Sequence, residues 1–388
     1  MPAKIFAIAF SLTLGLTICS IAADERISDD DDFGSYPAAF EGPAGEGKEP
    51  VLQRYPNPGL VDTVVGGPWQ TPQQAPTMME CVSGVCQQSC EQCCRGGWVG
   101  GVGVYVIKPH WTTNPAFATT VASGSVNVDS QTDFPYSYYA TPLVWFGYVG
   151  ENGLGARTRF WLFDQSSTTT FTNDGSASVI SAAPLNYLNS STTAGDVLTF
   201  TSGLRVDVID FELTQTFQAG AFTGQLSAGG RYTRIEQTYH HVEAPLTTLD
   251  DIVDSSHSFN GFGPSIGAEV RRPILDGGFS LYASGRGSIL FGKSSQLATN
   301  INNNEVTNFG SYANWDVVPT LETEIGILWQ RNTDRGRVFL DAGVVGIAFF
   351  GAGNAANNQI LLNSTDDQAD KNATLGFFGF KLAAGMTY

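Results

Sequence analysis

The chain has 388 residues and carries 37 acidic against 20 basic side chains, which gives a net charge of −17. Charged residues make up only 15% of it, well below the roughly 25% of ordinary soluble domains. The acidity excludes a nucleic-acid-binding protein, which needs a basic surface. Abundant glycine (44 residues) and 12% aromatic residues, at this low charge, fit a chain that faces lipid on one side and water on the other.

Residues 1–22 have the pattern of a secretory signal peptide. Lys4 precedes an apolar stretch at 5–18, and small residues follow at 20–22, so we expect the exported chain to begin near Ala23. Beyond this segment no apolar run reaches the roughly 18 residues of a membrane-spanning helix. If the protein crosses a membrane, it must therefore do so as a closed barrel.

Residues 23–96 differ from the rest of the chain. They hold twelve acidic and four basic residues, including the acidic run at 29–32, together with scattered proline and glycine. Such a composition cannot bury a core, so we predict an extended or disordered extension. It ends in a cluster of five cysteines: Cys81, Cys86, Cys90, Cys93 and Cys94. Disulfides are the expected use in an oxidising compartment, with metal binding, intermolecular pairing and a reactive thiol as alternatives.

From Gly97 onward, stretches of alternating apolar and polar residues predict strands, because successive side chains of a strand point to opposite faces. The stretches are 98–107, 136–149, 155–163, 204–217, 221–238, 258–271, 278–291, 313–329, 336–350 and 375–388. Short turn signals separate some of them, and three polar segments, 164–203, 292–312 and 351–374, are expected to be long loops. Short turns on one rim and long loops on the other are typical of outer-membrane barrels.

The alternation assigns faces to individual strands. In 313–329, Trp315, Ile325 and Trp329 share an apolar side, and the two tryptophans are expected to mark the two membrane interfaces. Leu281 belongs to the same kind of face in 278–291. Segment 204–217 changes phase, since its apolar residues switch faces after residue 208, and this predicts a β-bulge.

The last strand, 375–388, ends on an aromatic residue, Tyr388, and has one apolar and one polar face. We expect it to be the strand through which the barrel-assembly machinery recognises the chain. The predicted fold class is all-β: a transmembrane antiparallel β-barrel of about 10–12 strands at 97–388. A soluble β-sandwich is the alternative, and it would have to pack its tryptophan-bearing faces against one another.

Five segments resemble successive strands of the Legionella-type major outer membrane protein family: 155–164, 204–215, 228–237, 259–273 and 281–292. The resemblance runs from about Gly97 to Tyr388 and leaves out the acidic extension. It implies a β-barrel of a bacterial outer membrane and, by the habit of that family, a pore. It supplies no catalytic residues.

Eight charged residues fall opposite the apolar faces and are the candidate pore lining: Arg231, Glu269, Arg271, Arg286, Glu322, Glu324, Asp341 and Lys381. They predict a porin-like pore for passive diffusion of ions or small hydrophilic solutes, with a mild preference for cations. An internal network of salt bridges that fills a narrow barrel is the alternative. The protein would then be a closed structural or adhesive surface protein. The sequence permits a homo-oligomer but does not encode one.

The sequence predicts no enzyme, no cofactor and no metal site. Its one G-x-S-x-G match, at 263–267, lies inside a predicted strand and lacks the helix that follows a nucleophile elbow. Two of the four histidines, His240 and His241, are expected in a loop after a strand, and His110 at a strand end. The expected partners are outer-membrane lipid and small solutes or ions.

Overall fold

The computed structural model describes residues 96–123, 126–174, 179–182, 187–189, 194–244, 251–275, 277–302, 305–356 and 373–388. The predicted signal peptide, the extension up to residue 95 and its five cysteines lie outside the described residues. Among the described residues, no helix has the length and apolar character that a membrane crossing requires.

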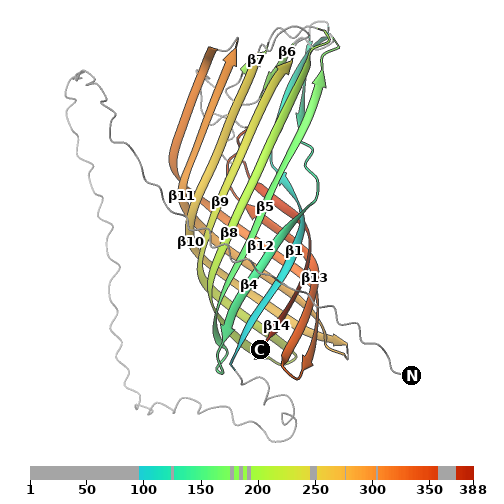
Figure 1. Ribbon diagram of the computed structural model, residues 1–388, viewed down its shortest axis with the longest axis vertical. Helices are drawn as coiled ribbons and strands as arrows, with labels where there is room; N and C mark the ends of the chain where they lie inside the picture. The colour runs from blue at the N-terminus through green and yellow to red at the C-terminus, as the bar shows by residue number, and fades with distance from the viewer. Residues whose placement is uncertain are drawn as a thin grey trace, which may run out of the picture. The chain divides into compact units, whose positions relative to one another are not determined.

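Ten antiparallel strands close into a barrel (Figure 1), and they follow one another around it in the order β1-β14-β13-β12-β11-β10-β9-β8-β5-β4. The predicted fold class is confirmed, with ten as the number of barrel strands, and each of the ten predicted stretches falls on one of them. The strands are β1 (Gly97–Trp111), β4 (Tyr139–Val149), β5 (Leu154–Thr172), β8 (Val197–Ala219), β9 (Phe222–Ala244), β10 (Asp251–Leu275), β11 (Phe279–Asn302), β12 (Glu305–Thr333), β13 (Gly336–Phe349) and β14 (Leu375–Thr387).

The two ends of the barrel differ. At the end where β1 begins and β14 stops, short turns join β4 to β5, β8 to β9, β10 to β11 and β12 to β13. Two of these turns need a glycine, since Gly153 has φ 78° and Gly220 has φ 58°, which side chains disfavour. We call this the terminal end and the opposite one the loop end.

Two of the three predicted long loops are largely strand. Residues 164–172 and 197–203 continue β5 and β8, and residues 292–302 and 305–312 continue β11 and β12. The loop prediction was wrong because it counted serine, threonine and asparagine as loop residues. These residues alternate with buried ones, and threonine favours strands. As a result, β5 and β8 to β12 extend beyond the other barrel strands at the loop end (Figure 1).

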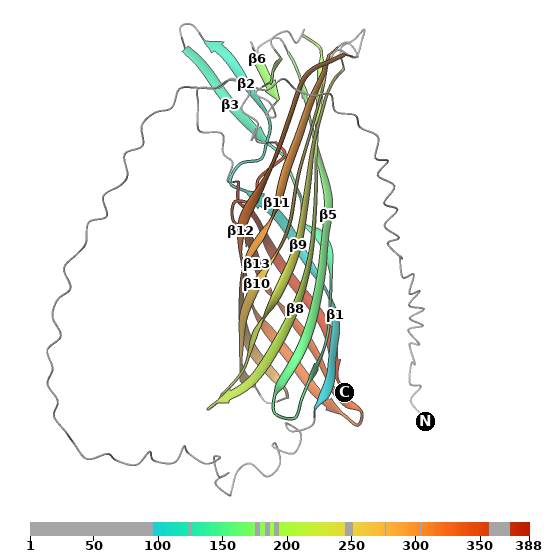
Figure 2. The same ribbon diagram turned by 90° about the vertical axis from the view of Figure 1, so that its left-hand side faces the viewer.

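A second, four-stranded sheet lies at the loop end (Figure 2), with the order β3-β2-β6-β7. It is built from the connection between β1 and β4 and from the connection between β5 and β8. Its strands are β2 (Pro115–Ser123), β3 (Val126–Asp133), β6 (Val179–Ala182) and β7 (Tyr187–Asn189).

Strand β8 contains no bulge, contrary to the prediction. Its pairing with β5 and with β9 runs without a register shift. Val206 and Val208 point inward together with Asp210, and Phe211 points outward. The phase change therefore reflects a change of environment: toward the terminal end the inner face is charged and the outer face apolar, and toward the loop end this is reversed.

The outer face near the terminal end is an apolar band. Ile325 is 63% exposed and Leu281 47%, and Trp315, at 78%, stands where β12 leaves the band. Apolar side chains exposed in this way around a closed barrel are the lipid-facing surface of membrane barrels. The faces predicted for 278–291 and 313–329 are confirmed by these exposures.

The inner face toward the loop end is a closely packed apolar core. Phe163 and Phe377 have ring centroids 5.0 Å apart, and Trp161 and Phe377 6.0 Å apart. The core also includes Ile107, Leu143, Val206, Ile235, Phe259, Leu290, Val318, Val345 and Phe349, all at most 2% exposed. On β8 to β10 this part of the wall is apolar inside, at Val206, Ile235 and Phe259, and polar outside, as in a soluble barrel.

Candidate functional site

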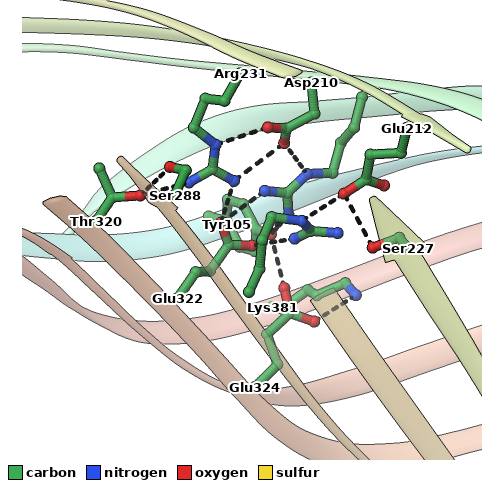
Figure 3. A network of polar contacts seen from close by, with 12 residues as sticks. Tyr105, Asp210, Glu212, Ser227, Arg231, Ser288, Thr320, Glu322, Glu324 and Lys381 are labelled. Carbon is green, nitrogen blue, oxygen red and sulfur yellow. Dashed lines mark hydrogen bonds and ion pairs between the residues drawn. The ribbon is translucent and has the colours of Figure 1, made fainter. Parts of the chain in front are cut away.

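The eight predicted pore-lining residues all lie on the inner face of the barrel, in its terminal half. The alternation of the strands places them there. They come from β9, β10, β11, β12, β13 and β14, and the closed barrel turns them toward one common interior. Most of them are joined to each other, or to further inner residues, in a network of ion pairs (Figure 3).

One ion pair links opposite walls of the barrel. Arg159 on β5 donates from Nη2 to Oε2 of Glu322 on β12 at 2.6 Å, and a second nitrogen also contacts this carboxylate. In the closed order of ten strands, β5 and β12 stand five places apart, which is half the circumference. The side chains of Arg159 and Glu322 therefore bridge the full width of the lumen.

Asp210 extends this bridge along the wall. It accepts a hydrogen bond from Nε of Arg159 at 3.0 Å and from Nε of Arg231 at 2.6 Å. Arg231 also donates from Nη2 to Glu322 at 3.1 Å and from Nη1 to Thr320 at 3.2 Å. Arg231 and Asp210 are both 0% exposed, so their charges are neutralised only by each other and by their neighbours.

A second carboxylate, Glu212 on β8, holds two further arginines. Arg286 donates from Nε to Glu212 at 2.7 Å and from Nη1 to Glu322 at 3.0 Å. Arg157 donates from Nη2 to Glu212 at 2.7 Å. We call these seven residues the ion-pair layer: Arg157, Arg159, Asp210, Glu212, Arg231, Arg286 and Glu322.

A smaller group adjoins the layer on the β12 to β14 side (Figure 3). Lys381 donates to Glu324 at 2.9 Å and lies 3.4 Å from Asp341. The hydroxyl of Tyr105 donates to the other oxygen of Glu324 at 2.8 Å and accepts from Arg159 at 3.2 Å. This group connects the ion-pair layer to β1, β13 and β14, so that charged groups cross the lumen between nearly all strands.

The carboxylates of the ion-pair layer are shielded from water. Glu322 is 2% exposed and Glu212 4%, whereas the walls of an open channel carry their charges in water. The barrel interior at this level is therefore filled by side chains.

Between the layer and the terminal end the lumen holds a cavity of about 1200 Å³. Predicted residues that line it include Glu269, Arg271, Asp341 and Lys381, with Trp145 as an aromatic wall. Glu269 and Arg271 form an ion pair of their own. Arg271 is partly exposed, and it faces this polar space.

Toward the loop end, the segment that follows β13 folds into the lumen. Gln237 donates to the carbonyl oxygen of Gly353 at 3.1 Å and accepts from the backbone N–H of Ala355 at 3.3 Å. Asn354 donates to the side chain of Asn114 at 3.0 Å and is 2% exposed. This segment and the apolar core fill the barrel beyond the ion-pair layer.

The predicted lining leaves out four residues of the ion-pair layer: Arg157, Arg159, Asp210 and Glu212. Arg157 and Arg159 alternate with Trp161 in a predicted strand, so parity alone could have placed them inside. Asp210 and Glu212 were hidden by the apparent phase change of 204–217, since its inner face changes from valine to carboxylate within two residues.

Two histidines are buried toward the loop end, outside the apolar band. The prediction that His240 and His241 lie in a loop was wrong. Both lie in β9, because this strand extends as far as Ala244. The ring of His241 stacks on Phe200 with centroids 4.4 Å apart, and Nε2 of His257 lies 3.0 Å from the hydroxyl of Ser294. Burial lowers the pKa of both imidazoles to about 4.

These two pKa values predict that acid loosens the loop-side half of the barrel. The unfolded chain binds protons at His241 and His257 below a pH of about 6.5, whereas the folded chain does so only near 4. Stability therefore falls as the pH is lowered from about 6.5 toward 4. Amide hydrogen exchange of β9 and β10 is expected to be faster at pH 5 than at pH 7.5, once corrected for the intrinsic rate.

The control for this prediction is His240, which is half exposed and contacts Asp254 at 2.5 Å on the outer face. The variant His240→Gln should keep the acid dependence, and the double variant His241→Phe with His257→Leu should lose most of it. Equal acid dependence in all three proteins would contradict the assignment.

The sequence of this chain is similar to that of an outer-membrane protein family. The family model of the Legionella pneumophila major outer membrane protein precursor matches residues 93–386. A search of curated proteins found no match. The outer membrane protease OmpT of Escherichia coli is similar at 12% identity, over 75% of this chain and 96% of that one, with a TM-score of 0.40.

Two transport proteins are also among the similar structures. A FadL homologue of Pseudomonas aeruginosa has 8% identity over 76% of this chain and 90% of its own, with a TM-score of 0.23. The toluene transporter TodX of Pseudomonas putida has 8% identity over 75% and 89%, with a TM-score of 0.18. At these identities and TM-scores the likenesses assign no function to this chain.

Proposed function

Because the chain belongs to the Legionella pneumophila major outer membrane protein family and is a β-barrel of the bacterial outer membrane, we propose that its barrel is closed and acts as a rigid membrane anchor for its extracellular half. In barrels of this kind the short turns lie on the periplasmic side and the long connections outside the cell. The loop end, with the extended strands β5 and β8 to β12 and the second sheet, is then the part displayed at the cell surface.

One observation carries this proposal: the bridge of Arg159 and Glu322 across the lumen, inside a layer whose carboxylates are buried. Beyond the layer an ion would also have to pass the apolar core around Trp161 and Phe377. Moving an unpaired charge into such surroundings costs several kcal/mol or more. Two successive barriers of different chemistry oppose conduction through this conformation.

A pore for ions or small hydrophilic solutes is the second candidate. It is favoured by the cavity of about 1200 Å³ on the periplasmic side, whose charged lining suits hydrated solutes. Conduction would require the arginines of the layer, the core and the segment that follows β13 to rearrange. The pore-forming role and its cation preference therefore stay predictions.

The G-x-S-x-G match at 263–267 does not have the geometry of a nucleophile elbow. Ser265 of the G-x-S-x-G match is 2% exposed and points inward from the middle of β10. A nucleophile elbow needs its serine exposed at a sharp strand-to-helix turn, which this strand does not provide.

Conductance of the purified, detergent-extracted protein in a planar lipid bilayer tests the proposal. We expect the protein to insert without producing current. This should hold both at low salt and at about 1 M salt, where surface charges are screened. Discrete current steps that grow with salt would refute the closed barrel and establish the pore, and the reversal potential under a salt gradient would then give its charge preference.

A further inference from the structure

The outer face of β8 to β12 changes chemistry sharply where these strands leave the apolar band. Strand pairing places outward residues of adjacent strands in rows. One row is apolar or aromatic throughout: Ile209, Tyr232, Phe262, Phe291 and Val317. The next row toward the loop end is Asp207, Arg234, Asn260, Lys293 and Trp315. We call the first row the aromatic row and the second the polar row. They are adjacent, so the outer face changes from apolar to polar between one row and the next.

Three hydrogen-bond donors stand side by side in the polar row. Arg234, Asn260 and Lys293 lie on the adjacent strands β9, β10 and β11, and all three are exposed. Since neighbouring strands are about 4.8 Å apart, Arg234 and Lys293 leave the wall about 10 Å from each other, with Asn260 midway. Side chains of this length can converge on one group placed over Asn260.

The middle donor is oriented by its neighbour in the aromatic row. The hydroxyl of Tyr232 lies 3.4 Å from Oδ1 of Asn260 and donates to it. The amide nitrogen of Asn260 is then directed away from Tyr232 and can donate outward. The guanidinium of Arg234, the amide nitrogen of Asn260 and the ammonium group of Lys293 are donors in one row, which is the chemistry that binds an oxyanion.

Acidic neighbours restrict where such an anion can lie. Glu236 forms an ion pair with Arg234, and Asp207 pairs with Arg205, both on the β8 and β9 side. No carboxylate among the described residues forms an ion pair with Lys293. An anion held by this row is therefore expected to lie over Asn260 and closer to Lys293 than to Arg234, because the charge of Lys293 is not already neutralised.

We propose that Arg234, Asn260 and Lys293 form a clamp for the phosphate of an outer-leaflet lipid, whose acyl chain lies along Phe262 and Phe291. The aromatic row indicates that the ligand is a lipid and not a soluble molecule. Phe262 is 59% exposed and Phe291 54%, directly beside the donors and within the lipid-facing band. A ligand that satisfies both rows needs a phosphate and an apolar chain joined end to end. Trp315, paired with Lys293, flanks the headgroup at interface level.

Native mass spectrometry of the full-length protein in detergent tests the clamp, with dioleoyl phosphatidic acid and dioleoyl phosphatidylcholine as probes. The unmodified protein is expected to bind phosphatidic acid at least about tenfold more tightly, since charge-assisted hydrogen bonds stabilise a complex by more than the roughly 1.4 kcal/mol of that factor. The double variant Arg234→Gln with Lys293→Gln should lose this preference. Excess inorganic phosphate should not displace the lipid.

The matched control removes two outward arginines at the other end of the barrel, Arg272→Gln with Arg331→Gln. Arg272 lies over the ring of Phe222 near the turn between β8 and β9. This control should retain the preference for phosphatidic acid. Equal binding of both lipids by the unmodified protein, an equal loss in the control, or displacement by inorganic phosphate would each overturn the proposal. Heat-resistant migration in gels, measured for every variant, verifies that the barrel has folded.

Discussion

Replacing Glu322 with glutamine is expected to lower the free energy of unfolding by about 3–5 kcal/mol, the usual consequence of removing one partner from a buried ion pair. Glu322 contacts three arginines, Arg159, Arg231 and Arg286. The ion-pair layer holds four arginines against three carboxylates, so the substitution leaves it with two positive charges in excess. Denaturant titration of the protein folded into lipid vesicles measures the change.

Two further variants make this result specific to the layer. Asp164→Asn removes a carboxylate from an exposed pair with Arg205 at 3.9 Å, and it should change stability by no more than about 1 kcal/mol. Adding Arg159→Met to Glu322→Gln removes one of the two excess positive charges and returns the layer to its original balance, so it should restore part of the loss. An unchanged midpoint for Glu322→Gln would show that the layer does not stabilise the barrel.

An arginine in place of Ile325 or of Leu281 should reduce folding into the membrane at a cost of about 2–4 kcal/mol near the middle of the bilayer. Both side chains point to lipid, with exposed fractions of 63% and 47%, and they lie on the paired strands β12 and β11. The yield of heat-resistant barrel in vesicles gives the measurement. Ser256→Arg, which also points outward but lies beyond the apolar band, should fold normally.

A loss in Ser256→Arg as large as in Ile325→Arg would contradict the boundary of the lipid-facing band. Normal folding of both lipid-face variants would contradict the assignment of faces itself. These outcomes do not depend on whether the barrel conducts, so they test the placement in the membrane separately from the proposed closure.

Local pattern determined the strands and most of their faces. The alternation around Leu281 and Ile325 is sufficient to assign these two side chains to the lipid-facing side. A strand places every second side chain on the same side, whatever its neighbours are. It also placed the predicted charges, Arg231 and Glu322 among them, on the inner face. What it could not provide was the partner of each charge. The contact of Arg159 with Glu322 joins residues 163 positions apart in the chain.

The alternation pattern also did not predict where along a strand the inner face changes from apolar to charged. In β8 the inner face passes from Val208 to Asp210, and an alternation rule interprets this as a bulge, although the backbone is regular. The same holds for the polar stretches of β11 and β12 that were predicted as a loop.

The sequence by itself therefore determined a closed β-barrel with its lipid-facing side, since these follow from the period of a strand and from the need to satisfy the backbone in lipid. Only the tertiary structure decided that the inner charges meet across the lumen, that the extracellular half has an apolar interior, and that Arg234, Asn260 and Lys293 form one row. Each of these depends on strand order and register, which are set by pairing between distant segments and leave no periodic signal in the chain.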